Sequence, residues 1–326
     1  MRRSQIVGTG HYLPERVVTN DDLSKLVDTN DEWIRQRTGI CERRWARDDE
    51  AASDMGVEAA MAALDDAGIS PEEVDYVLCA TVCADHFFPS TACLIQDRIG
   101  ARPIGASDFN AACSGFLYGI QMADALIRSG TYDTILLVGV EKLSVYIDYE
   151  KRDTAVLFGD GSGAVVLRVA ESESGVLSTF TGSDGSAKEI LWVPSGGSRT
   201  PITPENINDI VLGMVMDGQP LYKRAVASFV QSVEAALADS NFAVDDIDLF
   251  IPHQANIRII QSAASRLKFP EEKTFVNLDK TGNTSAASIP IALDQARKAG
   301  RVKEGDIVLF AAFGAGLTWA SAIIRW

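Results

Sequence analysis

A weak internal repeat constrains the fold of this chain more than any other feature of its sequence. Residues 62–78 read AALDDAGISPEEVDYVL and residues 235–251 read AALADSNFAVDDIDLFI, and an offset of 173 holds from Ala62 to Asp75. Each segment has the pattern of a helix followed by a strand. A nearly constant offset over about 75 residues favours duplication over chance similarity.

The matching extends along both halves. The helical segments 114–130 and 284–300 match at an offset of 170, which pairs Cys113 with Asn283, and both end at glycine. The segments 132–138 and 304–310 match at close to the first offset of 173. We therefore expect that one half carries a small insertion between its matched segments. Two equivalent halves are predicted, residues 1–172 and 173–326.

The alternation of helix and strand patterns predicts an α/β protein. The runs YVLCATV, TILLVGV and DIVLFAAF are continuously apolar, as in strands that are covered on both faces. Hydrophobic residues make up 46% of the 326 residues, which is enough to bury a large core.

Composition and charge argue against several classes of protein. No stretch reaches about 18 consecutive apolar residues and the N-terminus has no signal-peptide pattern, so we expect a cytoplasmic protein without a membrane span. A net charge of −15 argues against a nucleic-acid or anionic membrane surface. Five cysteines in such a chain predict reduced thiols rather than a disulfide framework.

Cys113 is the best candidate for a nucleophile. It is predicted to lie between the end of a strand and the first turn of a helix, where α/β sheets bind ligands. A helix N-terminus lowers the pKa of a thiol there. The surrounding sequence NAACSGF has small residues that leave room for a substrate. The other four cysteines lie in apolar or charged settings that favour structural roles.

Two further side chains are candidates for the same site. His253 follows an apolar strand that matches the one ending near Ala80, so it should lie at the ligand-binding edge of the second half. Asn283 would be an ordinary turn residue except for its match with Cys113. A glycine-containing turn within residues 311–326 is expected to bring backbone N–H groups toward Cys113 as an oxyanion hole, the alternative being a plain hairpin.

Two other kinds of site fit the sequence less well. A metal site could be assembled from cysteines and a histidine, but its spacing matches no familiar zinc pattern; its members would be Cys79, Cys83, His86 and Cys93. Papain-like proteases also use Cys, His and Asn in this order. Their signature around the cysteine is absent here, and a duplicated α/β pattern is foreign to them.

Six motifs extend over essentially the whole chain, at residues 31–40 (DEWIRQRTGI), 108–116 (DFNAACSGF), 158–164 (FGDGSGA), 252–256 (PHQAN), 282–288 (GNTSAAS) and 313–319 (FGAGLTW). In their order and spacing they resemble, taken together, the motifs of the β-ketoacyl-acyl carrier protein synthase III family of condensing enzymes. The resemblance implies a thiolase-like fold, in which two duplicated α/β halves pack as a layered α-β-α-β-α core.

The resemblance also implies a two-step reaction without a cofactor or metal besides the substrates. Cys113 would take an acyl group from acyl-CoA, with the backbone N–H groups of Cys113 and Ala315 as the oxyanion hole. Malonyl-acyl carrier protein would then lose carbon dioxide and condense with the acyl group. His253 and Asn283 would donate hydrogen bonds to the malonyl thioester carbonyl.

Further residues match positions that bind coenzyme A in the family. Trp33 would stack on the adenine with Arg152 on its other side, and Arg37 would contact a phosphate. Gly218 and Asn256 would line the pantetheine tunnel.

Other matches imply an acyl pocket and two protein partners. Phe313 would line the acyl pocket, and Phe88 would reach into the acyl pocket of the partner subunit in a homodimer. Lys223, Arg224 and Arg258 would form a local basic patch for the acidic acyl carrier protein.

The sequence departs from the common family pattern at a few places. Ala315 replaces a frequent glycine and would be strained if the position needs a positive φ. Gln219 and Pro220 also differ, as does the segment 82–90 near the acyl pocket, so the preferred primer is open. Polyketide-type condensing enzymes, hydroxymethylglutaryl-CoA synthases, acyltransferases with another acceptor and inactive relatives remain alternatives.

Overall fold

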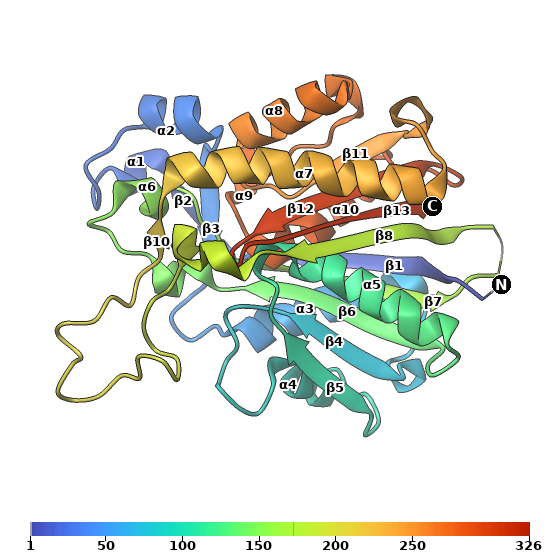
Figure 1. The fold of residues 1–326 in the computed structure, drawn as a ribbon. Helices are drawn as coiled ribbons and strands as arrows, with labels where there is room; N and C mark the ends of the chain where they lie inside the picture. The colour runs from blue at the N-terminus through green and yellow to red at the C-terminus, as the bar shows by residue number, and fades with distance from the viewer. Residues whose placement is uncertain (1, 172) are drawn as a thin grey trace.

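The computed structural model of the chain describes residues 2–171 and 173–326, and it contains two central β-sheets of the same kind (Figure 1). The first sheet consists, in spatial order, of β1 (Ser4–Tyr12), β7 (Gly161–Val169), β6 (Thr134–Glu141), β4 (Tyr76–Ala80) and β5 (Gly105–Phe109). The second consists, in spatial order, of β8 (Gly175–Ser183), β13 (Thr318–Arg325), β12 (Ile307–Gly314) and β11 (Leu249–Pro252).

The two sheets share strand order and direction, which confirms the predicted duplication. In the first sheet β4 is parallel to β5 and β6, whereas β7 is antiparallel to β6 and β1. In the second sheet β11 is parallel to β12, and β13 is antiparallel to β12 and β8. Strand β12 begins 173 residues after β6, and every residue of both strands is buried. This burial confirms that both of their faces are covered.

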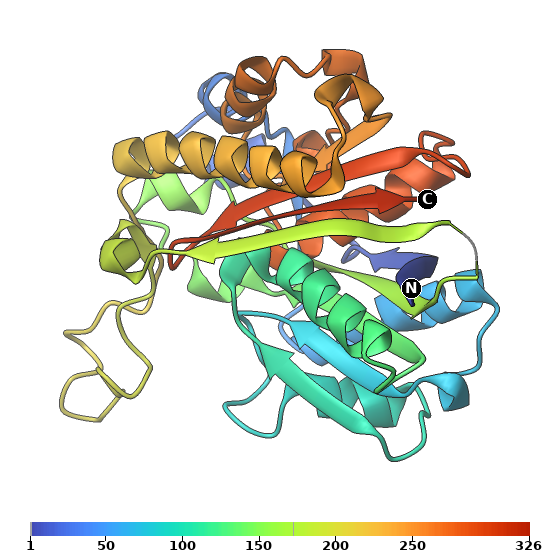
Figure 2. The ribbon, with the colours of Figure 1, turned by 45° about the vertical axis from the view of Figure 1, so that its right-hand side comes forward.

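Helices form three layers around the two sheets (Figures 1 and 2). The larger ones are α3 (Ala52–Ala67), α4 (Thr91–Arg98), α5 (Gly115–Arg128), α7 (Gly218–Ser240), α8 (Ile257–Leu267) and α10 (Ser288–Lys298). Apolar residues of α5 and α10 pack against both sheets, so these helices form the middle layer. Helices α3 and α4 cover the outer face of the first sheet, and α7 and α8 cover that of the second. The predicted α-β-α-β-α layering is therefore confirmed.

Several small elements lie beside the two central sheets. They are β2 (Arg16–Thr19), α1 (Asn20–Leu23), α2 (Asp31–Thr38), β3 (Glu42–Trp45), α6 (Arg152–Ala155), β9 (Leu191–Trp192), β10 (Val215–Met216) and α9 (Leu278–Thr281). Helix α2 begins where the Asn30 side chain accepts the backbone N–H of Trp33 at 2.8 Å. It ends at Gly39, whose φ of 81° suits glycine.

The connection between the halves follows β7. The strands of the first sheet lie within residues 4–169 and those of the second within 175–325. The predicted boundary falls at residue 172, which lies outside the described residues. Within the described ranges, no helix combines the length and apolar character needed to cross a membrane.

Candidate active site

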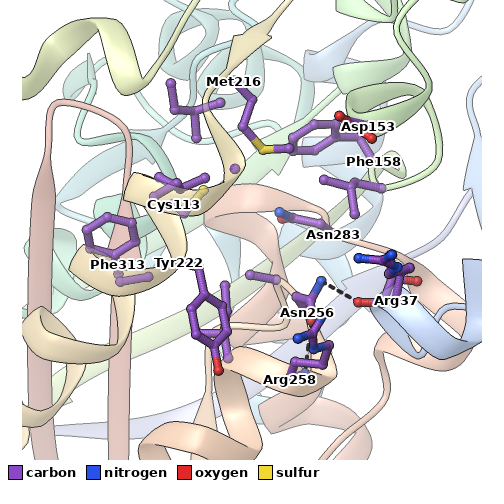
Figure 3. A pocket seen from close by; sticks show the side chains of 18 of the residues that line it. Arg37, Cys113, Asp153, Phe158, Met216, Tyr222, Asn256, Arg258, Asn283 and Phe313 are labelled. Atoms are coloured by element: carbon purple, nitrogen blue, oxygen red, sulfur yellow. Dashed lines mark hydrogen bonds between the residues drawn. The ribbon is translucent and has the colours of Figure 1, made fainter.

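A cavity of about 710 Å³ combines residues of both halves (Figure 3). Cys113 comes from the first half, whereas His253 and Asn283 come from the second. The three side chains that the sequence predicted to act together thus line one space. Other predicted residues that line it are Trp33, Arg37, Gly218, Lys223, Asn256, Arg258 and Phe313.

Cys113 lies in a short 3₁₀ turn, Ala112–Ser114, between β5 and α5. The thiol is therefore at the N-terminus of α5, as predicted. Burial raises the pKa of the Cys113 thiol to about 12, and hydrogen bonding with the Ser285 hydroxyl lowers it only in part. The expectation of a lowered pKa is wrong, because desolvation outweighs the favourable effects. The resting sulfur is a thiol.

His253 directly follows β11 and is buried. Burial lowers the pKa of His253 to about 3, so the imidazole is neutral at physiological pH. Its Nδ1 lies 2.6 Å from Oγ of Ser288, which also accepts the backbone N–H of Gln254 at 3.5 Å. A Ser288 hydroxyl hydrogen directed at Nδ1 leaves the ring hydrogen on Nε2, which is the tautomer that can donate to a substrate.

The Asn283 side chain is held by the turn that it begins. Its Oδ1 accepts the backbone N–H of Ser285 at 2.9 Å. That oxygen is thereby engaged within the turn, so the Nδ2 hydrogens are left as donors for a substrate. Figure 3 shows Asn283 between Phe158 and Asn256, on the same cavity as Cys113.

The two turns at the site are structural repeats, but with a pairing that differs from the prediction. Asn110 accepts the backbone N–H of Ala112 at 3.1 Å, just as Asn283 accepts that of Ser285. Ala112 and Ser285 have matching φ values of 46° and 48°. Asn283 is therefore equivalent to Asn110 at the offset of 173, and its predicted equivalence to Cys113 is wrong.

The turn between β12 and β13 lies against Cys113. A Cβ atom added at Gly314 would lie 2.7 Å from the Cys113 nitrogen, so glycine permits this close approach. The Thr318 hydroxyl donates to the carbonyl oxygens of Ala111 at 2.8 Å and Ala315 at 3.1 Å, which ties the two turns together. Ala315 is not among the described non-glycine residues with positive φ, so the strain considered for this position does not arise.

The residues predicted to bind coenzyme A gather at the mouth of the cavity. Cζ of Arg152 lies 4.4 Å from the centroid of the Trp33 ring, and Cζ of Arg37 lies 5.8 Å from it. Asn256 begins α8 by accepting the backbone N–H of Arg258 at 2.9 Å, and its Nδ2 donates to the Arg37 carbonyl at 3.1 Å. The mouth is therefore braced between α2 and α8.

Four predicted residues do not line the cavity: Phe88, Arg152, Arg224 and Ala315. Phe88 is 86% exposed. Arg224 pairs with Asp184, with Nη1 and Oδ2 2.9 Å apart, whereas Lys223 and Arg258 face the cavity and an adjoining surface groove. Within the described residues, no group of three or more His, Cys, Asp or Glu side chains is arranged to hold a metal ion.

Family models and curated relatives match this sequence. A model described as 3-oxoacyl-[acyl-carrier-protein] synthase III matches residues 107–185, and its C-terminal counterpart matches residues 237–326. The β-ketoacyl-[acyl-carrier-protein] synthase III of Caldanaerobacter subterraneus subsp. tengcongensis is 48% identical, over 98% of this chain and 97% of its own length. The chain belongs to the β-ketoacyl-acyl carrier protein synthase III family.

Solved structures agree with this assignment. The 3-oxoacyl-[acyl-carrier-protein] synthase III of Aquifex aeolicus superposes with a TM-score of 0.93 at 46% identity, covering 99% of this chain and 100% of that one. A priming β-ketosynthase of a polyketide pathway superposes with a TM-score of 0.91 at 35% identity, covering 99% and 96%. The chain is thus a condensing enzyme of the acyltransferase type with the thiolase fold.

The sequence assigned no individual role to three side chains of the site, of which Ser285 and Ser288 lie within the motif at residues 282–288. Ser285 belongs to the turn that begins at Asn283, Ser288 contacts His253, and Glu141 is buried at the end of β6. The offset of 173 pairs Glu141 with Gly314, which lies beside Cys113. The repeat could therefore have drawn attention to Glu141.

Proposed function

We propose that this chain joins an acyl group from acyl-CoA to malonyl-acyl carrier protein, with Cys113 as the acyl carrier. The meeting of Cys113, His253 and Asn283 on one cavity is the observation that carries the proposal. The enzymes of this family catalyse the condensation that starts fatty acid synthesis.

Acyl loading calls for a nucleophile and for donors to the tetrahedral oxyanion. Cys113 is the nucleophile, and its own backbone N–H with that of Ala315 forms the proposed oxyanion hole. The close approach of Gly314 to Cys113 supports this geometry.

Decarboxylation of the malonyl group produces an enolate, whose oxygen needs hydrogen-bond donors. The neutral His253 donates through Nε2, and Asn283 donates through Nδ2. Thiol, imidazole, amide and backbone groups supply this chemistry, so the proposal includes no resident cofactor or metal.

The mouth of the cavity is suited to the nucleotide end of acyl-CoA. Trp33 and Arg152 offer stacking surfaces for the adenine, and Arg37 offers charge for a phosphate. Gly218 and Asn256 border the path for the pantetheine, and Phe313 borders the acyl group near Cys113.

Acyl carrier protein and a second copy of the chain are the proposed protein partners. Lys223 and Arg258 at the cavity mouth would attract the acidic carrier, with Arg224 beside them. The exposed aromatic rings of Phe87 and Phe88 offer apolar surface for a homodimer partner. We place the enzyme in the cytoplasm, where its cysteines would stay reduced.

A polyketide-type priming enzyme is the second candidate, favoured by the 35% identity to the priming β-ketosynthase. It would use the same residues with a different primer or acceptor. Comparing acetyl-, branched and longer acyl-CoA primers with malonyl-acyl carrier protein distinguishes these uses of the site.

Mass spectrometry of the acylated protein tests the function directly. Incubation with acyl-CoA should add one acyl group, mapped to Cys113, and addition of malonyl-acyl carrier protein should discharge it as the condensed product. Cys113→Ala should show no adduct, whereas Cys41→Ala should behave as the wild type. A stable adduct on another cysteine would overturn the assignment.

A further inference from the structure

The ring of His253 makes one hydrogen bond within the described residues, and its partner is Ser288. Ser288 is the first residue of α10, and both side chains are buried. Oγ of Ser288 lies 2.6 Å from Nδ1 of the ring. The backbone of His253 is held separately, because its N–H donates to the Ala311 carbonyl of β12 at 2.8 Å. The bond to Ser288 therefore fixes the ring rather than the chain.

The surroundings of Ser288 decide which of the two groups donates. The other neighbour of Oγ is the backbone N–H of Gln254, at 3.5 Å, and an N–H group can only donate. Within the described part of the chain, Nδ1 is thus the acceptor that the Ser288 hydroxyl hydrogen reaches. Burial lowers the pKa of His253 to about 3, so the ring carries a single hydrogen. A neutral ring that accepts at Nδ1 carries this hydrogen on Nε2.

The first half contains the same contact without either polar group. The register of β11 on β12 repeats that of β4 on β6 at an offset of 173, which makes Ala80 the equivalent of His253. The first residues of α5 and α10, Gly115 and Ser288, are equivalent at the same offset. A Cβ atom added at Gly115 would lie 3.0 Å from Cβ of Ala80, so the two positions are also in contact in that half.

This repeated contact separates the needs of the fold from those of the site. The first half packs an alanine against a glycine here, so the fold closes at this contact without a hydrogen bond. In the second half both positions are polar and both side chains are buried. A buried hydroxyl and a buried imidazole carry a desolvation cost that alanine and glycine avoid. The pair therefore points to a task at the cavity that His253 lines.

We propose that Ser288 is a positioning residue, which holds the His253 ring with its hydrogen on Nε2 for decarboxylation of the malonyl group. The proposal rests on the proposed function, because it concerns the donor that His253 offers to the enolate oxygen. Ser288 does not itself line the cavity, so it acts through His253. A ring with its hydrogen on Nδ1 would present a lone pair at Nε2, which cannot stabilise an enolate oxygen.

The two half-reactions of Ser288→Ala give the first test. Acyl loading relies on Cys113 and backbone donors, so mass spectrometry should show loading at close to the wild-type rate. Carbon dioxide release from malonyl-acyl carrier protein by the fully acylated variant should fall by roughly 10- to 100-fold, as when a metal-bound histidine loses the partner that fixes its tautomer. Loss of the donor itself costs about 10²- to 10³-fold, so His253→Ala sets the upper limit.

Nitrogen NMR of the histidine rings gives a readout that a merely structural role would not move. The chain has three histidines, so selective ¹⁵N labelling shows three rings, and comparison with His253→Ala assigns one of them. In the wild type at neutral pH, the His253 ring should give one protonated and one unprotonated nitrogen resonance. In Ser288→Ala the two resonances should move toward each other, because the ring then exchanges between its tautomers.

Ser232→Ala is the matched control for the loss of a buried hydroxyl. Ser232 lies within α7, and its hydroxyl donates to the Phe229 carbonyl at 2.9 Å. Its replacement should leave loading, decarboxylation and the His253 resonances unchanged.

Several results would overturn the positioning role. A wild-type His253 ring with its hydrogen on Nδ1 would refute the tautomer on which the role depends. Unchanged ring resonances or wild-type decarboxylation in Ser288→Ala would show that His253 needs no partner at Nδ1. Equal losses of loading and decarboxylation would assign Ser288 to the fold. Failure of the wild type to acquire an acyl group on Cys113 would instead refute the proposed function, and the NMR measurement would still test the tautomer.

Discussion

At the scale of single residues, burial sets the protonation of the groups around the reacting centre. Desolvation raises the pKa of Cys113 to about 12 and that of Glu141 to about 7, and it lowers the pKa of His253 to about 3. Each shift favours the neutral form. The site is therefore close to uncharged, which suits a neutral thioester.

We predict that Glu141→Gln stabilises the protein at pH 8 more than at pH 5. The carboxyl pKa is 4.5 in the reference state and about 7 in the folded protein. The folded state therefore binds the proton more tightly, and the stability that this gives below pH 4.5 is lost as pH rises through 7. Glutamine stays neutral, so the difference should reach about 3 kcal/mol.

Urea unfolding at the two pH values measures this difference. Glu58→Gln on the exposed face of α3 is the matched control and should show no such dependence on pH. A Glu141→Gln variant that is equally or less stabilised at pH 8 would show that the wild-type carboxylate is well accommodated when ionised.

The sequence identified the reacting residues but not their electrostatic setting. Cys113, His253 and Asn283 stand in motifs, and Cys113 and His253 follow predicted strands, so their placement on one cavity could be anticipated. The direction of the Cys113 pKa shift could not, because desolvation depends on how completely distant segments cover the sulfur. Glu141 was missed for the same reason, since its carboxylate comes near the site through packing of β6 on a turn from the other half.

At the scale of elements, the repeat was detected in the sequence but aligned wrongly at one place. Aligning the glycines that follow the two central helices gave an offset of 170. The structure retains 173 from the asparagine turns to the helix starts, and α10, at 11 residues, is shorter than the 14-residue α5. Hydrophobic periodicity fixes the face of a helix better than its end, so the length difference was misplaced.

The contact between β1 and α3 predicts a steric limit at Gly8. A Cβ atom added there would lie 2.3 Å from the Ala63 carbonyl oxygen and 2.7 Å from the Ala67 nitrogen. These are backbone atoms of α3, so the strand and helix must separate. We expect Gly8→Ala to lower the free energy of unfolding by about 1–3 kcal/mol, as overpacking does.

The urea midpoint of unfolding measures the cost at Gly8. Gly185→Ala is the matched control, because an added Cβ there meets no atom within 4 Å and its φ is not positive. Equal midpoints for the Gly8→Ala and wild-type proteins would mean that β1 and α3 can move apart without loss of stability.

At the scale of the whole molecule, net charge and local charge have opposite effects on an acidic partner. The chain carries a formal charge of −15, which repels an acidic protein at long range. At physiological salt, charges beyond about 8 Å are largely screened. The residues at the cavity mouth therefore decide whether the carrier protein docks, and Lys223 and Arg258 are cations at that mouth.

Arg258→Glu should weaken condensation with malonyl-acyl carrier protein while leaving acyl loading from CoA almost intact. Arg258 lies with its Cζ 5.9 Å from the Tyr222 ring, beside the groove next to the cavity, whereas the proposed nucleotide contacts are Trp33, Arg37 and Arg152. Reversing one charge in a docking patch acts mainly on association, so the loss should appear in kcat/KM for the carrier substrate and shrink at high salt.

Lys303→Glu isolates the effect of position from that of net charge. Lys303 is exposed just before β12, at the opposite end of that strand from Gly314, and its reversal changes the net charge by the same two units. Salt screens charges that are distant from the docked carrier protein, so this variant should load and condense like the wild type. Equal losses of loading and condensation in Arg258→Glu would assign that residue to CoA binding or to the fold. Equal losses of condensation in both variants would make the overall charge, rather than the patch, the feature that governs docking.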